Sequence, residues 1–251
     1  MPKITLMLAG DVMTGRGIDQ ILPRPSPPVL YEDYLKSALG YVTLAEEVNG
    51  LIPRPVPPAY VWGDLPAALV RHRPDLRIVN LETAITRSET PWPKAINYRM
   101  NPANAACLTA GALDCCVLAN NHVLEWGEEG LVETLATLAA TGIAAAGAGR
   151  DMAQAAAPAV LGVPGKGRVL VYGVACASSG VPLEWSAGTG RPGVAYLDDA
   201  DPAALKPLLA RIAQDRQAGD VVVCSIHWGP NWGYEIAPGH RRIAHALIEA
   251  G

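Results

Sequence analysis

The stretch VLANNHVLEWG, residues 117–127, determines how the rest of the chain is interpreted. It continues an apolar run that starts at Cys115, and this run predicts a buried strand over residues 115–119. The run ends abruptly in two amides and an imidazole, Asn120, Asn121 and His122. Polar side chains at the carboxyl end of a buried strand are typical of a binding site in an α/β protein.

Apolar runs alternate with helical patterns on both sides of this stretch, which predicts an α/β fold with buried strands. Strands are expected over residues 4–9, 76–79, 115–119 and 221–226, with a hairpin over 158–163 and 168–174. Helices are expected over residues 31–48, 65–72, 102–110, 128–140, 202–217 and 241–250.

Four of the expected strands end in side chains that are common in metal sites. These endings are Asp11, Glu82, the pair Asn121 and His122, and His227. Each one alone could be a turn residue or a helix cap. Because all four occur at strand ends in one chain, turn chemistry alone is a poor explanation, and a shared site is predicted.

The composition excludes several classes of protein. Half of the 251 residues are hydrophobic and 18% are charged, which argues against a disordered chain. The net charge of −4 and the lack of a long basic run give no reason to expect nucleic acid as a partner. We expect one domain over residues 1–251. We also expect a cytoplasmic location, since neither a signal peptide nor a run of 18 apolar residues is found.

The five cysteines and the final residues lead to two further expectations. The cysteine count is odd and contains no CxxC pair, so reduced and mostly buried thiols are predicted. A helix, glycine, strand pattern occurs in CLTAGALDCCVLA (107–119) and TLAATGIAAAG (137–147), and ALIEAG (246–251) begins it again. The expectation is therefore either a truncated sheet or an unusually short one.

Five segments in order carry a resemblance to a known family: GDVMTGRG (10–17), VNLETAIT (79–86), LDCCVLANNHVLEWGEEGL (113–131), GIAAAGAGR (142–150) and SIHWGPNW (225–232). Together they resemble the CapA family of poly-γ-glutamate capsule biosynthesis, within the calcineurin-like metallophosphoesterase superfamily. The resemblance implies a metallophosphoesterase-like four-layer αββα sandwich, truncated at its C-terminal end.

The resemblance also implies roles for individual residues. Asp11, Glu82, Asn121 and His227 stand at the positions of metal ligands, with Glu82 where a carboxylate bridges two metals. His122 stands at the position of the catalytic histidine, which contacts substrate or donates a proton. Carboxylate, amide oxygen and imidazole together suit one or two divalent ions of Mn, Zn, Fe or Mg.

The sequence departs from the superfamily pattern at several positions. Met13 stands where many phosphoesterases have a histidine, and position 82 is Glu rather than Asp. Val123 directly follows His122, and the nearest acid, Glu125, comes one turn later. The GHxH-type histidines expected after a further strand are absent from the 251 residues. His240 is a poor substitute, because it precedes a helix.

Three basic residues are candidates for substrate binding. Arg16 lies five residues after Asp11, and Lys94 and Arg99 lie in the loop after the second strand. They could hold a phosphate or carboxylate of a small-molecule, phosphoester, peptide or polyglutamate substrate. The alternative is that these three residues are exposed in loops and bind no ligand.

Three functions remain open from the sequence. The first is a metal-dependent hydrolase in which one or two metals activate water, linked to poly-γ-glutamate capsule biosynthesis. The second is a metal-dependent, peptide-modifying enzyme that exchanges an α-carbon proton, as in peptide epimerisation. The third is a non-catalytic assembly or binding subunit with a degraded metal site.

Overall fold

The computed structural model describes residues 3–251 and has a mixed α/β architecture, which confirms the predicted class. The chain divides into two compact units. Unit 1 contains residues 3–4, 117–121 and 146–251, and unit 2 contains residues 5–116 and 122–145. The four-layer αββα sandwich implied by the resemblance stays a prediction.

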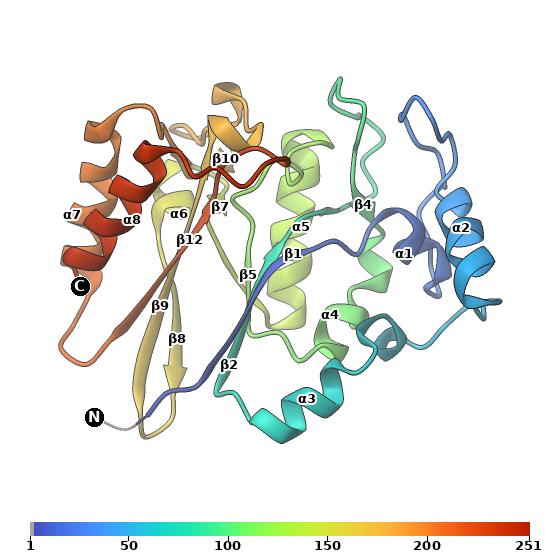
Figure 1. Cartoon of the computed structure of the whole chain (residues 1–251), viewed down its shortest axis with the longest axis horizontal. Helices are drawn as coiled ribbons and strands as arrows, with labels where there is room; N and C mark the ends of the chain where they lie inside the picture. The colour runs from blue at the N-terminus through green and yellow to red at the C-terminus, as the bar shows by residue number, and fades with distance from the viewer. Residues whose placement is uncertain (1–2) are drawn as a thin grey trace. The chain divides into compact units, whose positions relative to one another are not determined.

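Unit 2 is built on a four-stranded sheet with the order β1-β2-β5-β6, of which β1, β2 and β5 are labelled in Figure 1. Its strands are β1 (Leu6–Val12), β2 (Leu76–Leu81), β5 (Cys115–Val117) and β6 (Ala144–Ala146). The last residue of β5 and the last residue of β6 are counted with unit 1. β1 and β2 are parallel. The apolar runs therefore predicted three of these strands, β1, β2 and β5, to within a few residues.

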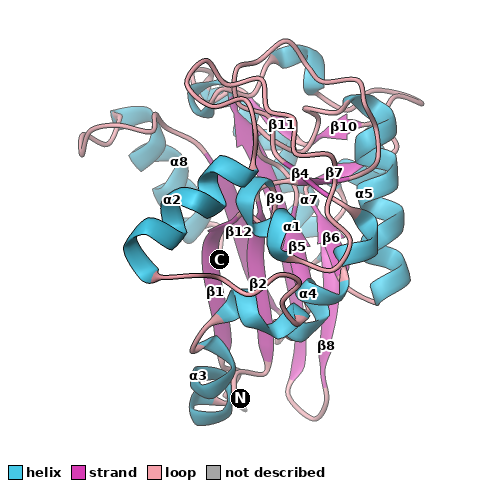
Figure 2. Ribbon diagram, turned by 90° about the vertical axis from the view of Figure 1, so that its right-hand side faces the viewer, coloured by secondary structure: helices cyan, strands magenta, loops and turns pink. Residues whose placement is uncertain are grey.

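Helices and short elements surround this sheet, and Figure 2 shows α1 and α4 over one of its faces. The helices of unit 2 are α1 (Arg16–Ile21), α2 (Leu39–Asn49), α3 (Leu65–His72), α4 (Ala106–Ala110) and α5 (Gly127–Thr141). The short strands β3 (Ala84–Ile85) and β4 (Arg99–Met100) pair with each other, and 3-10 turns occupy Pro58–Trp62 and Pro102–Asn104.

The helix predicted over residues 31–48 begins only at Leu39, so its first two turns were wrongly assigned. The preceding residues form a loop that is closed by a hydrogen bond from the Leu30 amide to the Lys36 carbonyl (3.0 Å). Glu32 in this loop is buried, with its carboxylate 2.7 Å from the Arg16 guanidinium. An ion pair between distant segments thus outweighs the local helical pattern.

Helix α5 follows the helical period predicted from its apolar residues. Leu131, Leu135 and Leu138 are buried along one side. The helix ends at Gly142, whose φ of 74° is left-handed, a conformation that glycine adopts at helix ends without steric cost.

Unit 1 contains a second sheet in which β9 (Gly167–Cys176) is the central strand. β9 forms the predicted hairpin with β8 (Ala159–Val163), and pairs in parallel with β11 (Tyr196–Leu197) and β12 (Val221–His227). β7 (Ala148–Gly149) and β10 (Gly193–Val194) form a separate antiparallel pair.

Helices α7 (Lys206–Asp215) and α8 (Pro238–Glu249) pack against β9 and β12 (Figure 1). Ile243 of α8 and Leu208 of α7 belong to the same apolar cluster as Val174 of β9. The remaining elements of unit 1 are α6 (Met152–Ala156) and 3-10 turns at Ala177–Ser179, Leu183–Trp185 and Pro202–Leu205. Within residues 3–251, no helix combines the length and apolarity that crossing a bilayer requires.

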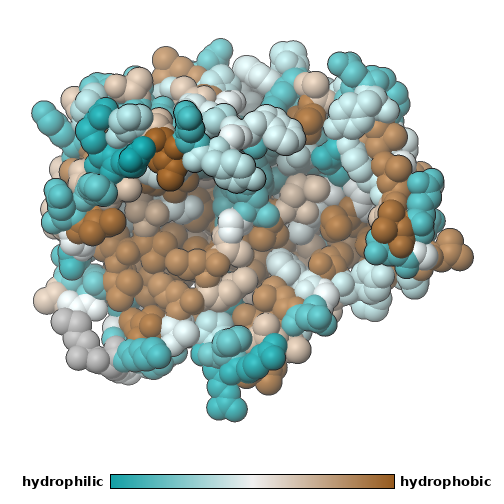
Figure 3. Space-filling view, viewed as in Figure 1, coloured by the Kyte–Doolittle hydropathy of each residue, from teal (hydrophilic) through white to brown (hydrophobic). Residues whose placement is uncertain are grey.

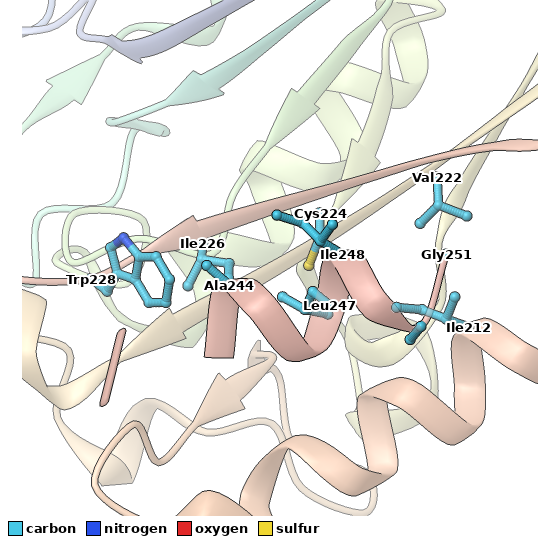
Figure 4. Close-up of a pocket in the computed structure, with 10 residues that line it drawn as sticks. Ile212, Val222, Cys224, Ile226, Trp228, Ala244, Leu247, Ile248 and Gly251 are labelled. Atoms are coloured by element: carbon cyan, nitrogen blue, oxygen red, sulfur yellow. The ribbon is translucent and has the colours of Figure 1, made fainter. Parts of the chain in front are cut away.

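An apolar groove of about 470 Å³ lies between β12 and α8 (Figure 4). Figure 3 shows a broad hydrophobic area on the side of the molecule where these two elements lie. The residues that line the groove include Ile212, Val222, Cys224, Ile226, Trp228 and Leu247. In the sheet order of the described residues, β12 stands at one end.

All five cysteines are free thiols, as the sequence predicted. Four of them are fully buried, and Cys224 is partly buried. Burial raises the pKa of the Cys107, Cys115 and Cys176 thiols to about 12, and that of Cys224 to about 11. These thiols are therefore protonated and chemically inert in the folded protein at neutral pH.

Gly173, in the middle of β9, allows the segment that leads to Asn121 to approach the sheet. A Cβ added at Gly173 would lie 2.5 Å from Cγ1 of Val117 and 3.1 Å from the Cα of Gly147. The 2.5 Å approach to Val117 is closer than real Cβ atoms come to other atoms, so a side chain at this position would force the buried contact to shift.

We expect Gly173→Ala to lower the free energy of unfolding by about 1–3 kcal/mol, because the added methyl overpacks a buried contact. Urea denaturation monitored by circular dichroism measures this change. The matched control is Gly162→Ala in β8, where an added Cβ meets nothing within 4 Å. Equal stability of the two variants would contradict the close approach at Gly173.

Candidate metal and proton-transfer site

A β-bulge in β1 sets the direction of Asp11. Ala9 pairs with Val79 and Asp11 pairs with Asn80, so Gly10 is an additional residue on β1. Such bulges redirect a side chain and are frequent beside active sites. The Asn80 side-chain amide donates to Oδ1 of Asp11 (2.7 Å), which fixes the carboxylate.

Glu82 directly follows β2 and lies beside Asp11. Its backbone amide donates to the carbonyl of Val12 at the end of β1 (2.9 Å). Burial and the neighbouring Asp11 raise the pKa of the Glu82 carboxyl to about 8. Two carboxyl groups held together in this way repel each other when ionised. A divalent cation would relieve that repulsion, so the pair fits a metal site.

His122 lies on the same side of unit 2 as this carboxyl pair. Its Nε2 is 3.6 Å from Oε1 of Glu82, and its Nδ1 is 2.8 Å from Oε1 of Glu125. The Tyr98 ring stacks on the imidazole, with 3.8 Å between the ring centroids. Burial and the nearby Lys94 charge lower the pKa of His122 to about 2, so the imidazole is neutral.

Glu125 is a member of this cluster that was not among the predicted site residues. Its side chain is fully buried, accepts a hydrogen bond from the Tyr98 amide (2.7 Å) and lies 2.7 Å from Nζ of Lys94. Burial raises the pKa of Glu125 to about 8, although Lys94 opposes the shift. The spacing HVLE, with the acid three residues after His122, was the available signal, because it places both side chains on one turn.

The raised pKa values of Glu82 and Glu125 make the stability of the metal-free protein dependent on pH. Both carboxyls keep their proton to about pH 8 in the folded state but lose it near pH 4.5 when unfolded. The folded state therefore binds more protons between these values, and stability falls as pH rises. His122 contributes little in this range, because it is neutral when folded and loses its last unfolded-state protons just above pH 6.5.

We expect the free energy of unfolding of the metal-free protein to fall by about 2 kcal/mol for each of the two carboxyls between pH 6.5 and 8.5. Urea denaturation of chelator-treated protein at these two pH values measures the loss. Glu125→Gln should remove about half of it. A stability that stays level or rises over this interval would contradict the proposed protonation states.

The three predicted substrate-binding residues lie in different surroundings. The Lys94 and Arg16 charges both act on His122, and Lys94 contacts Glu125. The Arg16 guanidinium also lies over the Tyr41 ring, 3.9 Å from its centroid.

Arg99 is buried, and its guanidinium lies 4.0 Å from the centroid of the Trp126 ring while donating to the Ser88 carbonyl (2.6 Å). These contacts anchor β4 and the loop that precedes it. Binding of substrate by Lys94, Arg16 and Arg99 stays a prediction.

The other two predicted metal ligands, Asn121 and His227, belong to unit 1. His227 is the last residue of β12, and its Nε2 lies 3.2 Å from Oδ1 of Asn121. The structure thus brings Asp11, Glu82 and His122 together within unit 2, and Asn121 and His227 together within unit 1. Asn121 immediately precedes His122 in the chain, so one peptide bond joins the two groups.

Comparison with known proteins agrees with the motifs that these residues occupy. Residues 5–251 match the family described as "Bacterial capsule synthesis protein PGA_cap". The chain is 46% identical over 250 residues to a "Probable polyglutamine synthesis accessory protein" of Mycobacterium tuberculosis. It is 28% identical over 181 residues to the "PGA biosynthesis protein CapA" of Bacillus subtilis.

These alignments cover more of this chain than of its relatives. The alignment with the M. tuberculosis protein covers 99% of this chain and 66% of that protein. The alignment with the B. subtilis protein covers 68% of this chain and 43% of that protein. The chain therefore spans just under two thirds of the length of the M. tuberculosis relative. Since the family match extends over nearly all of its residues, the chain belongs to the bacterial capsule synthesis protein (PGA_cap) family, as its resemblance to CapA predicted.

Proposed function

We propose that the chain is a metal-dependent hydrolase that acts in the synthesis or processing of a polyglutamate-type capsule polymer. The observation that carries the proposal is the Asp11–Glu82 carboxyl pair beside a neutral, buried His122. Membership of the capsule synthesis family and the names of the relatives support the link to the polymer.

Asp11 and Glu82 would hold the divalent metal. Their oxygen ligands suit Mn, Mg, Fe or Zn, and the repulsion between the two carboxyls gives the cation a favourable place. The prediction that Asn121 and His227 complete the ligand set still stands. Bound there, the ion would polarise a phosphoryl or carbonyl oxygen and make water more acidic.

His122 would move the proton in this reaction. Its Nδ1 faces Glu125 at 2.8 Å, and this contact orients the ring and presents Nε2 on the side of Glu82. Because the imidazole is neutral at pH 7, Nε2 would exchange a proton with water or with a leaving group.

The positive charges of Lys94 and Arg16 support a proposal for the class of substrate. Both lie close enough to act on the charge of His122, and both are only partly exposed. Cations in this position favour an anionic substrate, such as a phosphate ester or a glutamyl carboxylate beside an amide bond.

Metal reconstitution combined with a substrate panel tests the function. Chelator-treated protein would be loaded with Mn²⁺, Zn²⁺, Fe²⁺ or Mg²⁺ and assayed on phosphomonoesters, phosphodiesters and γ-glutamyl amides. We expect hydrolysis that requires one of these metals. Metal binding with deuterium uptake at an α-carbon, but without hydrolysis, would replace the proposal with epimerisation. Failure to bind any of the metals would leave only a non-catalytic subunit.

A further inference from the structure

A second polar cluster, Ser178, Asp199 and His240, lies within unit 1 and has no part in the site proposed above. Ser178 is in the 3-10 turn that follows β9, Asp199 is in the loop after β11, and His240 is in the first turn of α8. His240 is buried. Three segments far apart in the sequence therefore meet at one point.

Although its residue types match a serine hydrolase triad, the cluster has the wrong geometry for one. Nε2 of His240 lies 2.7 Å from Oδ2 of Asp199 and 3.3 Å from Oγ of Ser178, so one ring nitrogen faces both partners. The Ser178 hydroxyl donates to the same Asp199 oxygen. In a triad the two imidazole nitrogens serve the two partners separately. The cluster is therefore a structural network.

The network and the adjoining Ser179 hold the end of β12. Oγ of Ser178 accepts a hydrogen bond from the Gly229 amide (3.0 Å), and the Ser179 hydroxyl donates to the His227 carbonyl (2.8 Å). The Trp228 ring stacks on His240, with 4.7 Å between the ring centroids. Three consecutive residues, 227–229, are thus each held by a separate contact.

We propose that Ser178, Asp199 and His240 form a clamp that orients the His227 imidazole toward Asn121. Because the backbone of residues 227–229 is fixed, Nε2 of His227 stays within 3.2 Å of Oδ1 of Asn121. Ser178 is a positioning residue that acts through this backbone. The orientation belongs to unit 1 by itself, and only its effect on metal binding rests on the proposed function.

The direct test is the state of the His227 ring in metal-free protein, read from ¹H–¹⁵N NMR of the imidazole nitrogens. In the native protein we expect one dominant tautomer, held by the Asn121 contact. Ser178→Ala removes the acceptor of the Gly229 amide, so the His227 resonances should shift and broaden toward a mixture of tautomers. Ser178→Thr keeps the hydroxyl and should restore the native signals.

Two further variants separate the clamp from a general effect on folding. Asp199→Asn keeps the size of the side chain and should also disturb the His227 signals, even where Ser178→Ala folds poorly. His245→Gln changes an exposed histidine of the same helix α8 and should leave them unchanged. His227 signals that stay native in both Ser178→Ala and Asp199→Asn would overturn the proposal.

Metal affinity then distinguishes this proposal from the proposed function. If His227 is a ligand, Ser178→Ala should lower affinity by about 10-fold, as the loss of supporting contacts does in other metal sites. Native protein that binds no metal, with His227 signals that still respond to Ser178→Ala, would overturn the proposed function and support the clamp. Native protein that binds metal, with His227 signals that do not respond to Ser178→Ala, would support the proposed function and overturn the clamp.

Discussion

Replacing Glu82 with glutamine is expected to lower the affinity for divalent metal by more than about 100-fold, beyond the loss that supporting contacts alone produce. The substitution keeps the shape of the side chain but removes a carboxyl group that would ionise beside Asp11 to bind the cation. Isothermal titration of chelator-treated protein with Mn²⁺ or Zn²⁺ measures the change.

The same substitution should act in the opposite direction on the metal-free protein. Glutamine cannot ionise, so the repulsion from Asp11 that raises the pKa of Glu82 disappears, and stability at pH 8 should increase. A variant that is more stable without metal, yet gains no stability when metal is added, would separate a ligand from a purely structural acid.

Glu129→Gln is the matched control for this experiment. Glu129 is exposed in the first turn of α5, so the same change from glutamate to glutamine is made there without touching the site. We expect its metal affinity to remain native. Equal affinity of the Glu82 and Glu129 variants would refute the role of Glu82 as a ligand.

Replacing His122 with glutamine is expected to lower the rate of metal-dependent hydrolysis by about 10²–10⁴-fold, the usual contribution of general acid–base catalysis. Glutamine can still form hydrogen bonds in the buried position but cannot transfer a proton at neutral pH. Metal affinity should change little, since Nε2 of His122 lies 3.6 Å from Glu82 and the proposed ligands stay in place.

Steady-state kinetics on the best substrate of the panel, with metal content measured on the same samples, tests the role of His122. The control is His72→Gln, an exposed histidine in the last turn of α3. If the His122 variant keeps full turnover with full metal content, then His122 does not carry the proton and another group must.

The strands could be predicted from the sequence because their apolar runs are buried and local. Leu76 to Val79 lies within the observed β2, and the sequence also placed Glu82 just after this strand. The approach of Glu82 to Asp11 followed from the rule that parallel strands place their carboxyl ends at one edge. Asp11 also needs the bulge at Gly10, which depends on pairing with β2 and leaves little trace in the local sequence.

The features that the sequence did not predict depend on contacts between distant segments. Residues 31–38 have a helical pattern, but Glu32 instead pairs with Arg16. Glu125 is close to His122 in the chain, yet its burial and its contacts with Lys94 and Tyr98 come from another loop. Arg99 looks like an anion-binding residue, although its guanidinium is occupied by Trp126 and Ser88.

The reactivity of the buried thiols reports which part of the protein opens. A thiol-specific reagent attacks only thiolates that it can reach, so the four fully buried cysteines resist labelling until the structure around them unfolds. Cys224 is less buried and lines the groove between β12 and α8, so it reports separation of that helix from the sheet. Mass spectrometry of pulse-labelled protein can therefore distinguish opening at α8 from global unfolding without any added probe.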